Sequence, residues 1–138
     1  NRSEYAGVDS AYYTGSFETR FIGNLLAGWR FNPKWEVSGK YRLATGLPYT
    51  PFATAGPEEG ERDFTQYNQQ RLPTYSAVDI RIDRRWSFRA VQLDVYLDIQ
   101  NLFGAENVTG TYWNERTQQE EFDEGLGILP TIGVNVEF

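Results

Sequence analysis

The interpretation of this sequence starts from its last stretch, which reads Thr131-Ile132-Gly133-Val134-Asn135-Val136-Glu137-Phe138. Apolar residues alternate in it with small or polar ones, and the side chains of a β-strand point alternately to the two faces of a sheet. The stretch therefore predicts a strand with one apolar and one polar face. The apolar face carries Ile132, Val134, Val136 and Phe138.

The composition favours strands and excludes several classes of chemistry. Aromatic residues make up 16% of the 138 residues, which favours strands or interfaces over helical bundles. Cys and His are both absent, which excludes thiolate nucleophiles, disulfides, Ser-His-Asp triads and most zinc sites. We therefore expect no cofactor.

The charge argues against nucleic acid as a partner. The formal net charge is −6, whereas neutralising phosphates requires clustered Lys and Arg. Nearly half of the acidic residues lie in two stretches, 58–63 and 115–124. Their carboxylates could bind Ca²⁺, but the spacing of an EF-hand loop is missing. We therefore interpret both stretches as solvated loops and expect no metal site.

Five segments of the chain alternate like strands, and no segment reads as a convincing helix. They cover about residues 17–31, 35–45, 75–86, 91–103 and 131–138. No run of about 18 apolar residues predicts a membrane helix. Strands, however, expose only alternate residues to lipid, so their mean hydropathy is low even in a membrane protein.

The connections between these segments alternate in length. They are short at Asn32–Lys34 and Ser87–Ala90 and long at about 46–74 and 104–129. This pattern is typical of transmembrane β-barrels, which have tight periplasmic turns and long outer loops. Residues 1–16 would then begin in an outer loop. We also expect a short exposed hairpin inside the second long loop, around 111–114 and 118–122.

Five strands cannot close a barrel by themselves. Single-chain bacterial barrels have an even number of strands, eight or more, and an open sheet in lipid leaves backbone groups unpaired at several kcal/mol each. We therefore expect the chain either to be part of a larger barrel or not to lie in a membrane. Without a signal-peptide pattern or an initiator methionine, it is expected to be mature, trimmed or a fragment.

Charged residues gather on the polar face of the third and fourth strands. A two-residue turn between these strands would place Arg81 opposite Asp98 and Arg85 opposite Asp94, and each pair would contribute roughly 0.2–1 kcal/mol. This face would be either the hydrophilic lumen of a barrel or the solvated face of a soluble β-sandwich.

The carboxylates of the same two strands raise the question of catalysis, because glycosidases use two carboxylates. The candidates are Asp79, Asp83, Asp94 and Asp98. Neighbouring Arg residues lower carboxyl pKa values, whereas a general acid needs a raised pKa. We therefore predict that the chain is not an enzyme and has no catalytic residue.

Aromatic residues are frequent in the two long loops and at the strand ends. Those in the loops are either the entrance of a ligand site, because exposed rings favour binding, or packing contacts between loops. The loop candidates are Tyr49, Phe52, Phe64, Tyr67, Tyr112 and Trp113. Those next to the short turns suit the aromatic girdle of a membrane barrel. These residues are Trp29, Phe31, Trp35, Trp86 and Phe138.

Several short motifs follow one another in a fixed order. They are Thr45-Gly46-Leu47-Pro48-Tyr49-Thr50-Pro51, Arg71-Leu72-Pro73-Thr74-Tyr75, Val78-Asp79-Ile80-Arg81, Leu97-Asp98-Ile99-Gln100-Asn101-Leu102-Phe103, Glu106-Asn107-Val108 and Leu129-Pro130-Thr131-Ile132-Gly133-Val134. Between about Trp29 and Phe138, this ordered set resembles the C-terminal end of TonB-dependent outer-membrane receptors.

The resemblance implies that residues 1–138 supply the last five antiparallel strands of a barrel of about 22 strands, in the outer membrane of a Gram-negative bacterium. Such receptors import scarce nutrients such as ferric siderophores, cobalamin or glycans. The implied partners are the remainder of the receptor with its plug, membrane lipid, TonB through a missing N-terminal segment, and the barrel-assembly machinery. This machinery would read Val134, Val136 and Phe138 as its signal.

Two alternatives stay open. A soluble β-sandwich could bind a ligand such as a glycan through the loop aromatics. A porin-like barrel without a plug would share the same strands, and only upstream sequence would distinguish it from a receptor.

Overall fold

The computed structural model describes residues 4–6 and 12–138. Within these ranges the chain is all-β, with one short 3₁₀-helix, η1 (Phe64–Gln66), and no α-helix. The described residues include no helix with the length and apolar character needed to cross a lipid bilayer. The expectation of an all-β chain with five antiparallel strands in one sheet is confirmed.

The chain divides into two compact units, each assembled from three segments. The first, called the loop unit here, consists of Asn1–Ile22, Leu43–Tyr75 and Glu106–Gly125. The second, called the sheet unit, consists of Gly23–Arg42, Ser76–Ala105 and Leu126–Phe138.

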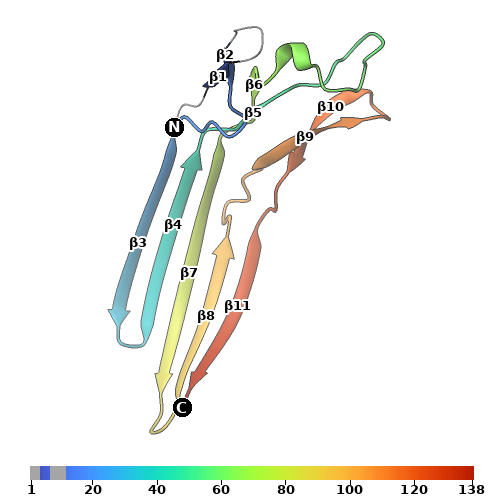
Figure 1. Ribbon diagram of the computed structural model, residues 1–138. Coiled ribbons are helices and arrows are strands. Elements are labelled where there is room, and N and C mark those ends of the chain that lie inside the picture. Colours follow the sequence, from blue (N-terminus) through green and yellow to red (C-terminus); the bar gives the residue numbers. More distant parts are fainter. Residues whose placement is uncertain (1–3, 7–11) are drawn as a thin grey trace. The chain divides into compact units, whose positions relative to one another are not determined.

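One five-stranded antiparallel sheet forms the sheet unit, with its strands in the order β11-β8-β7-β4-β3 (Figure 1). The strands are β3 (Ile22–Asn32), β4 (Trp35–Ala44), β7 (Tyr75–Ser87), β8 (Gln92–Gln100) and β11 (Leu129–Glu137). Strands that follow one another along this unit are also neighbours in the sheet, so the sheet is an up-and-down meander. The last strand begins slightly earlier than expected.

The turn between β3 and β4 is closed by a side chain. Asn32 Oδ1 accepts hydrogen bonds from the backbone N–H groups of Lys34 at 2.9 Å and Trp35 at 3.1 Å. Asn and Asp favour such turns because their side chains bond to backbone groups two or three residues ahead. The Asn-Pro-Lys sequence therefore accounts for the tight connection.

The turn between β7 and β8 sets their register. The Phe88 N–H donates to the Val91 carbonyl at 2.8 Å, which leaves two residues, Arg89 and Ala90, at its tip. Arg81 lies opposite Asp98 and Arg85 opposite Asp94, as counting from the turn predicts. The ion pairs follow this register only in part. Arg85 Nε lies 2.8 Å from Asp94 Oδ1, but Arg81 Nη2 lies 2.7 Å from Asp83 Oδ1 on its own strand. The expected Arg81–Asp98 pairing is thus right as a register, while the close carboxylate partner of Arg81 is Asp83.

The strand expected from about residue 17 begins only at Ile22, so this prediction is wrong for its first residues. The Glu18 N–H donates to the Gly15 carbonyl at 3.0 Å, which forms a turn. The Glu18 side chain is buried against Arg71. This ion pair holds the stretch in the loop unit instead of extending β3.

The fourth strand also ends before the predicted boundary near Phe103, because Asn101 turns the chain. Asn101 has a φ of +50°, in the left-handed region. Its Nδ2 donates to the Ala105 carbonyl and its Oδ1 accepts from the Ala105 N–H, both at 3.0 Å. Its own N–H donates to Asp79 Oδ1 at 3.0 Å. These bonds replace the ladder bonds of a longer strand.

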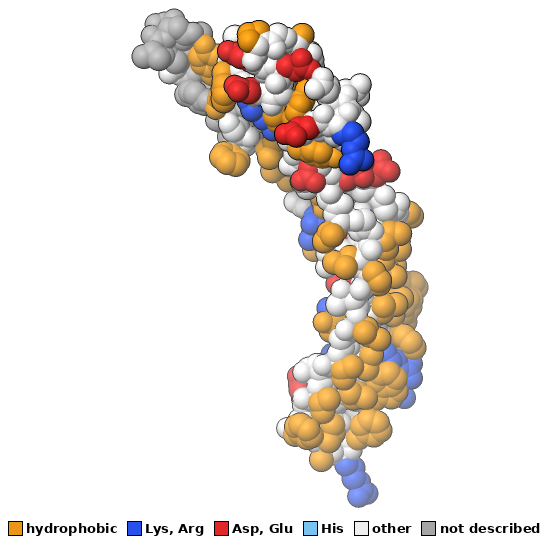
Figure 2. All heavy atoms as spheres, turned by 90° about the vertical axis from the view of Figure 1, so that its right-hand side faces the viewer, with side chains coloured by type: hydrophobic (Ala, Val, Ile, Leu, Met, Phe, Trp, Pro, Cys, Tyr) orange, Lys and Arg blue, Asp and Glu red, His pale blue; other side chains and the backbone are white. Residues whose placement is uncertain are grey.

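The two faces of the sheet differ in polarity, and neither belongs to a conventional core. Alternation along β7, β8 and β11 places Ile80, Ile82, Leu97, Leu93, Ile132, Val134 and Val136 on one face. Within the described residues, the only buried hydrophobic side chains are Leu72 and Ala77. Figure 2 shows hydrophobic side chains at the surface along the strands. Nothing in the described part of the chain therefore covers the apolar face.

Three small two-stranded antiparallel sheets occur in the loop unit (Figure 1). They are β1 (Glu4–Ala6) with β2 (Tyr12–Thr14), β5 (Pro48–Tyr49) with β6 (Gln70–Arg71), and β9 (Val108–Asn114) with β10 (Gln119–Glu124). The expected hairpin in the second long loop is confirmed and is longer than predicted. Of the stretch 1–16, residues 1–3 and 7–11 lie outside the described ranges.

The tip of the first long loop is closed by backbone hydrogen bonds. The Ala53 N–H donates to the Glu61 carbonyl, and the Gly60 N–H donates to the Ala53 carbonyl, each at 2.9 Å. Between them, residues 54–59 are exposed. The tip is thus held at its base, although residues 53–61 form no regular strand.

Candidate ligand-binding surface of the loop unit

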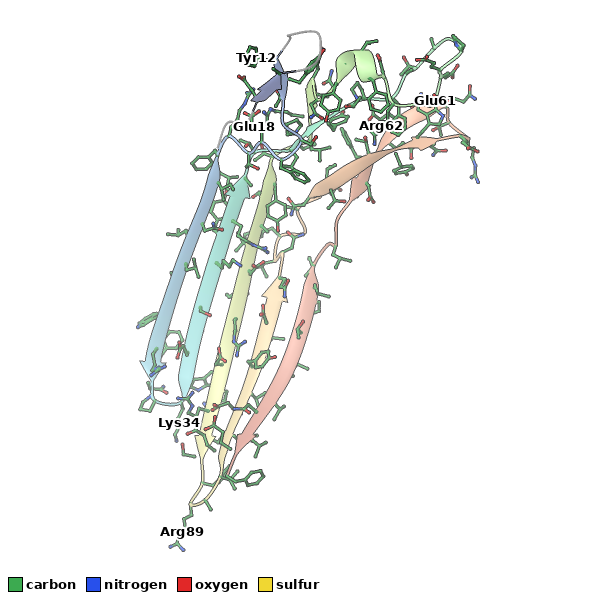
Figure 3. All side chains as sticks on the ribbon, viewed as in Figure 1. Tyr12, Glu18, Lys34, Glu61, Arg62 and Arg89 are labelled. Atoms are coloured by element: carbon green, nitrogen blue, oxygen red, sulfur yellow. The ribbon has the colours of Figure 1, made fainter. Side chains whose placement is uncertain are left out.

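A buried carboxylate fixes β6 to the stretch that precedes β3. Glu18 is 3% exposed, and its Oε2 lies 2.9 Å from Arg71 Nη2, across 53 residues of sequence (Figure 3). Arg71 Nη1 also donates to the carbonyls of Gly46 at 3.1 Å and Glu18 at 3.3 Å. A side chain at Gly46 would not fit, because an added Cβ would lie 1.8 Å from the Leu72 carbonyl oxygen.

Asn68 fixes the first long loop to β2. It is buried and has a φ of +53°, a conformation that Asn tolerates better than most residues. Its Nδ2 donates to the Thr14 carbonyl at 2.7 Å and to Ser16 Oγ at 3.0 Å. Its N–H donates to Thr50 Oγ1 at 3.1 Å. Together these bonds position the neighbouring ring of Tyr67.

Arg62 joins the first long loop to the β9–β10 hairpin (Figure 3). Its Nη1 donates to the Thr50 carbonyl and, at 2.9 Å, to Thr111 Oγ1, while its Nη2 donates to the Thr111 carbonyl at 2.9 Å. Its guanidinium carbon lies 3.9 Å from the ring centroid of Phe52, and its Nη1 lies 3.9 Å from Glu120 Oε1. One planar fork therefore links two loops that are far apart in sequence.

These contacts frame a pocket of about 360 Å³ within the loop unit. Among the residues that line it are Tyr49, Arg62, Phe64 and Tyr67. Burial, followed by the nearby Glu120 carboxylate, raises the pKa of Tyr49 above its ordinary value of 10.0, although Arg62 opposes this shift. The Tyr49 hydroxyl therefore keeps its proton and can donate. Rings, a hydroxyl and a guanidinium suit a ligand that has both flat apolar and polar faces.

A second pocket, of about 600 Å³, shares Tyr67 with the first. Its lining includes Tyr12, Tyr13, Arg20, Tyr67 and Arg71. The rings of Tyr13 and Tyr67 meet edge to face, with their centroids 6.0 Å apart. The guanidinium groups of Arg71 and Arg20 lie 2.9 Å and 3.7 Å from the Glu18 carboxylate. Guanidinium and phenol groups together suit an anionic or hydroxyl-rich ligand.

The six predicted aromatic residues all lie in the loop unit, but they do not share one surface. Three of them, Tyr49, Phe64 and Tyr67, line the first pocket. Phe52 and Trp113 pack on each other instead, with ring centroids 6.0 Å apart. Gly60 makes room for this packing, because its φ is +84° and an added Cβ would lie 2.8 Å from Trp113 Nε1.

Tyr112 belongs to the internal bonding of the hairpin. Its hydroxyl donates to Glu121 Oε2 at 2.8 Å, and this bond, followed by the Glu121 charge, raises the pKa of Tyr112. Glu121 also accepts from Thr117 Oγ1 at 2.9 Å and Asn114 Nδ2 at 2.8 Å. The hydrogen bonds from Tyr112, Thr117 and Asn114, in that order, lower the pKa of Glu121.

Sequence reasoning missed several residues of these pockets. The sequence does not predict three arginines as site residues, because their contacts cross from one loop to another. They are Arg20, Arg62 and Arg71. Tyr12 and Tyr13 lie before the first segment that alternates. Among the described residues, no group of three or more His, Cys, Asp or Glu side chains is placed to hold a metal ion.

The predicted assembly signal lies on β11 and directly after it. Val134 and Val136 are on the apolar face and are 62% and 44% exposed, while Phe138 is 99% exposed. Comparison with known proteins finds no family model, no curated protein and no solved structure that matches this chain.

Proposed function

We propose that this chain supplies the last five strands and two outer loops of a TonB-dependent outer-membrane receptor, whose barrel has about 22 strands. The observation that carries the proposal is the contrast between the two faces of the sheet. One face exposes large apolar side chains, and the other holds arginine–carboxylate pairs. Lipid against the first face and water against the second would satisfy both.

The apolar face needs a cover that the described residues do not provide. Leu25 and Trp29 are 67% and 69% exposed, and Ile132 and Val134 are 74% and 62% exposed. Full burial of such a side chain contributes roughly 1.5–3 kcal/mol. All described strands of the sheet unit belong to one sheet, so no second layer of this unit packs on it. This favours lipid over the alternative of a soluble β-sandwich.

Both edges of the sheet support membership of a larger barrel. β3 and β11 each pair with only one described strand, so each presents a row of unpaired backbone groups. Such groups cost several kcal/mol each in hydrocarbon. We expect further strands of the same polypeptide to pair with both edges and close the barrel.

Aromatic side chains support an orientation with the short turns in the periplasm. The rings of Trp29 and Phe31 lie 4.5 Å apart, near the turn end of β3, and Trp35 and Trp86 lie at the turn ends of β4 and β7. Trp and other aromatics concentrate at membrane interfaces. The two long loops, which join the opposite strand ends, would then face outward.

In this orientation the two pockets of the loop unit would meet the nutrient first. A ferric siderophore, cobalamin or a glycan presents the combination of flat and polar faces that these pockets suit. A plug, a TonB-binding segment and the remaining strands would come from the rest of the polypeptide. The apolar face of β11, with Val134, Val136 and Phe138, would be read by the barrel-assembly machinery.

The proposal is tested by isolating the native protein from membranes in mild detergent and determining the mass and sequence of the whole particle. We expect a much larger polypeptide with a plug-like N-terminal domain. A large barrel without a plug would favour the porin-like alternative. A 15.9 kDa protein that stays in solution without detergent would contradict the membrane proposal and favour the soluble module.

A matched pair of substitutions tests the facing of β11 in the membrane. Ile132→Lys puts a charge on the apolar face, and Thr131→Lys puts the same charge on the polar face. Ile132 is level with Ile82 of β7, five residues from the end of that strand and therefore deep in the proposed bilayer. A lipid-facing Lys costs roughly 2–4 kcal/mol near the bilayer centre. We expect Ile132→Lys to reduce the amount of heat-modifiable, folded protein in the membrane and Thr131→Lys to leave it nearly unchanged. Equal effects of the two would contradict the proposed facing.

A further inference from the structure

One charged side chain, that of Arg84, lies on the apolar face of the sheet. The other residues of that face in the described strands of the sheet are uncharged. Arg84 lies opposite Val95 on β8, and Val95 lies opposite Val134 on β11. The guanidinium therefore has aliphatic neighbours across the sheet, where a cation needs a specific partner.

Two Trp rings hold the Arg84 guanidinium. Its Cζ lies 4.5 Å from the ring centroid of Trp35 and 5.0 Å from that of Trp86. Cation–π contacts stabilise a guanidinium at such distances, but a ring does not replace a hydrogen-bond acceptor. Arg84 Nε is buried and has no hydrogen-bond partner. The two rings thus fix the position of the Arg84 guanidinium, but they do not satisfy all of its hydrogen-bond donors.

The carboxylates nearest in sequence and register are already engaged on the opposite face. Asp83 lies 2.7 Å from Arg81, and Asp94 lies 2.8 Å from Arg85. None of the ion pairs among the described residues includes Arg84. An anion for Arg84 would therefore come from outside the described residues.

The position of Arg84 along the strand indicates where such an anion would lie. β7 ends at Ser87, and a strand rises roughly 3.3 Å per residue, so Arg84 is about 10 Å from the turn end. In the proposed orientation this is the boundary between lipid headgroups and acyl chains. Arg side chains extend toward headgroups at this level, and Trp is enriched there.

We propose that Arg84, Trp35 and Trp86 form a binding site for the phosphate of a phospholipid in the leaflet at the turn end. This inference rests on the proposed function, since it requires the apolar face to lie in lipid. The guanidinium fork bonds two phosphate oxygens at once. The acyl chains lie over Val95 and Val134. A phospholipid fits this surface better than free phosphate. The valine side chains can contact acyl chains, but they have no polar group that could bind an ion.

The experiment is native mass spectrometry of the full-length protein that carries this chain, in mild detergent with added phosphatidylglycerol. We expect the wild type to retain phosphatidylglycerol and R84Q to bind it about five-fold more weakly. That factor corresponds to roughly 1 kcal/mol per basic residue near an anionic surface. R89Q removes the same charge from the exposed turn and is expected to bind like the wild type. R84K keeps the charge without the fork and is expected to fall between wild type and R84Q.

Equal retention of phosphatidylglycerol by wild type and R84Q would overturn the site. If R84Q does not assemble, unchanged binding by R84K would overturn it. Displacement of the lipid by inorganic phosphate at equal concentration would show a simple anion site and would overturn the lipid assignment. A wild-type barrel that retains no phosphatidylglycerol would contradict the lipid site but not the proposed function. A protein that is soluble without detergent would contradict both.

Discussion

A single methyl group at Gly133 tests the packing of the polar face of the sheet. Gly133 lies opposite Tyr96, and an added Cβ would lie 2.3 Å from Cζ and 2.4 Å from Cε1 and Oη of that ring. The ring covers Gly133 and also carries Arg81, whose Cζ lies 3.8 Å from the ring centroid. Gly133→Ala would therefore displace the Tyr96 ring and break its contact with Arg81.

The size of the effect follows from two contributions. Inserting an extra carbon into a packed contact costs about 1–3 kcal/mol, and the mobile tip of the ring favours the lower end of this range. Losing a partly exposed cation–π contact costs about 0.5–1 kcal/mol. We expect Gly133→Ala to lower the free energy of unfolding by about 2 kcal/mol, a factor of about 30 in the unfolding equilibrium.

The assay is equilibrium urea unfolding of the full-length protein in detergent, with midpoints compared at an unchanged slope. Adding Tyr96→Ala to Gly133→Ala should cancel most of the overpacking, so the double substitution should cost about 1 kcal/mol less than the sum of the single ones. Gly110→Ala is the control, because an added Cβ there meets nothing within 4 Å. A Gly133→Ala protein as stable as the wild type, or strictly additive costs, would refute the reasoning.

Three further substitutions test the loop unit. Arg62→Ala should raise the rate of limited proteolysis in the β9–β10 hairpin about tenfold, since a charge-assisted hydrogen bond contributes roughly 1.5–3 kcal/mol; an unchanged rate would contradict the proposed link. Gly60→Ala should lower the thermal midpoint more than Gly56→Ala, because both have positive φ but only Gly60 faces Trp113; equal shifts would exclude the packing cause. Tyr112→Phe should lower the stability of the hairpin between the pKa values of Glu121 and Tyr112 and flatten its dependence on pH, which the amide NMR signals of β9 and β10 would follow. The lowered pKa of Glu121 stabilises the hairpin above its ordinary value of 4.5, and this is lost as pH falls through the folded pKa. The raised pKa of Tyr112 stabilises it below 10.0, and this is lost as pH rises through the folded pKa. Identical pH profiles of wild type and Tyr112→Phe would rule out this pair as the cause.

The regular part of the fold can be predicted from the sequence because each strand repeats its pattern every two residues. The register of β7 and β8 follows by counting from their turn. The predictions fail where one side chain outweighs the pattern. Glu18 is buried by Arg71, which shortens β3, and the bonds of Asn101 end β8. Arg81 could reach Asp83 or Asp98, and alternation places both on its face without ranking them.

The candidate site is harder to predict because its contacts are long-range. Asn68 reaches Thr14 across 54 residues and Arg62 reaches Thr111 across 49 residues. No local pattern connects such pairs, so composition pointed to loops that line the pockets but named only part of the lining. Arg84 is different, because a charge at an apolar position of β7 is visible as a break in the alternation.

The closed base of the first long loop makes its tip a permissive position for inserted sequence. Residues 54–59 are exposed, and the backbone bonds of Ala53 to Gly60 and Glu61 hold the ends of this stretch together. Doubling the length of a loop with fixed ends costs only about 0.6 kcal/mol. In the proposed orientation, an epitope tag placed here would be displayed on the surface of intact cells, where an antibody could label it without touching the strands.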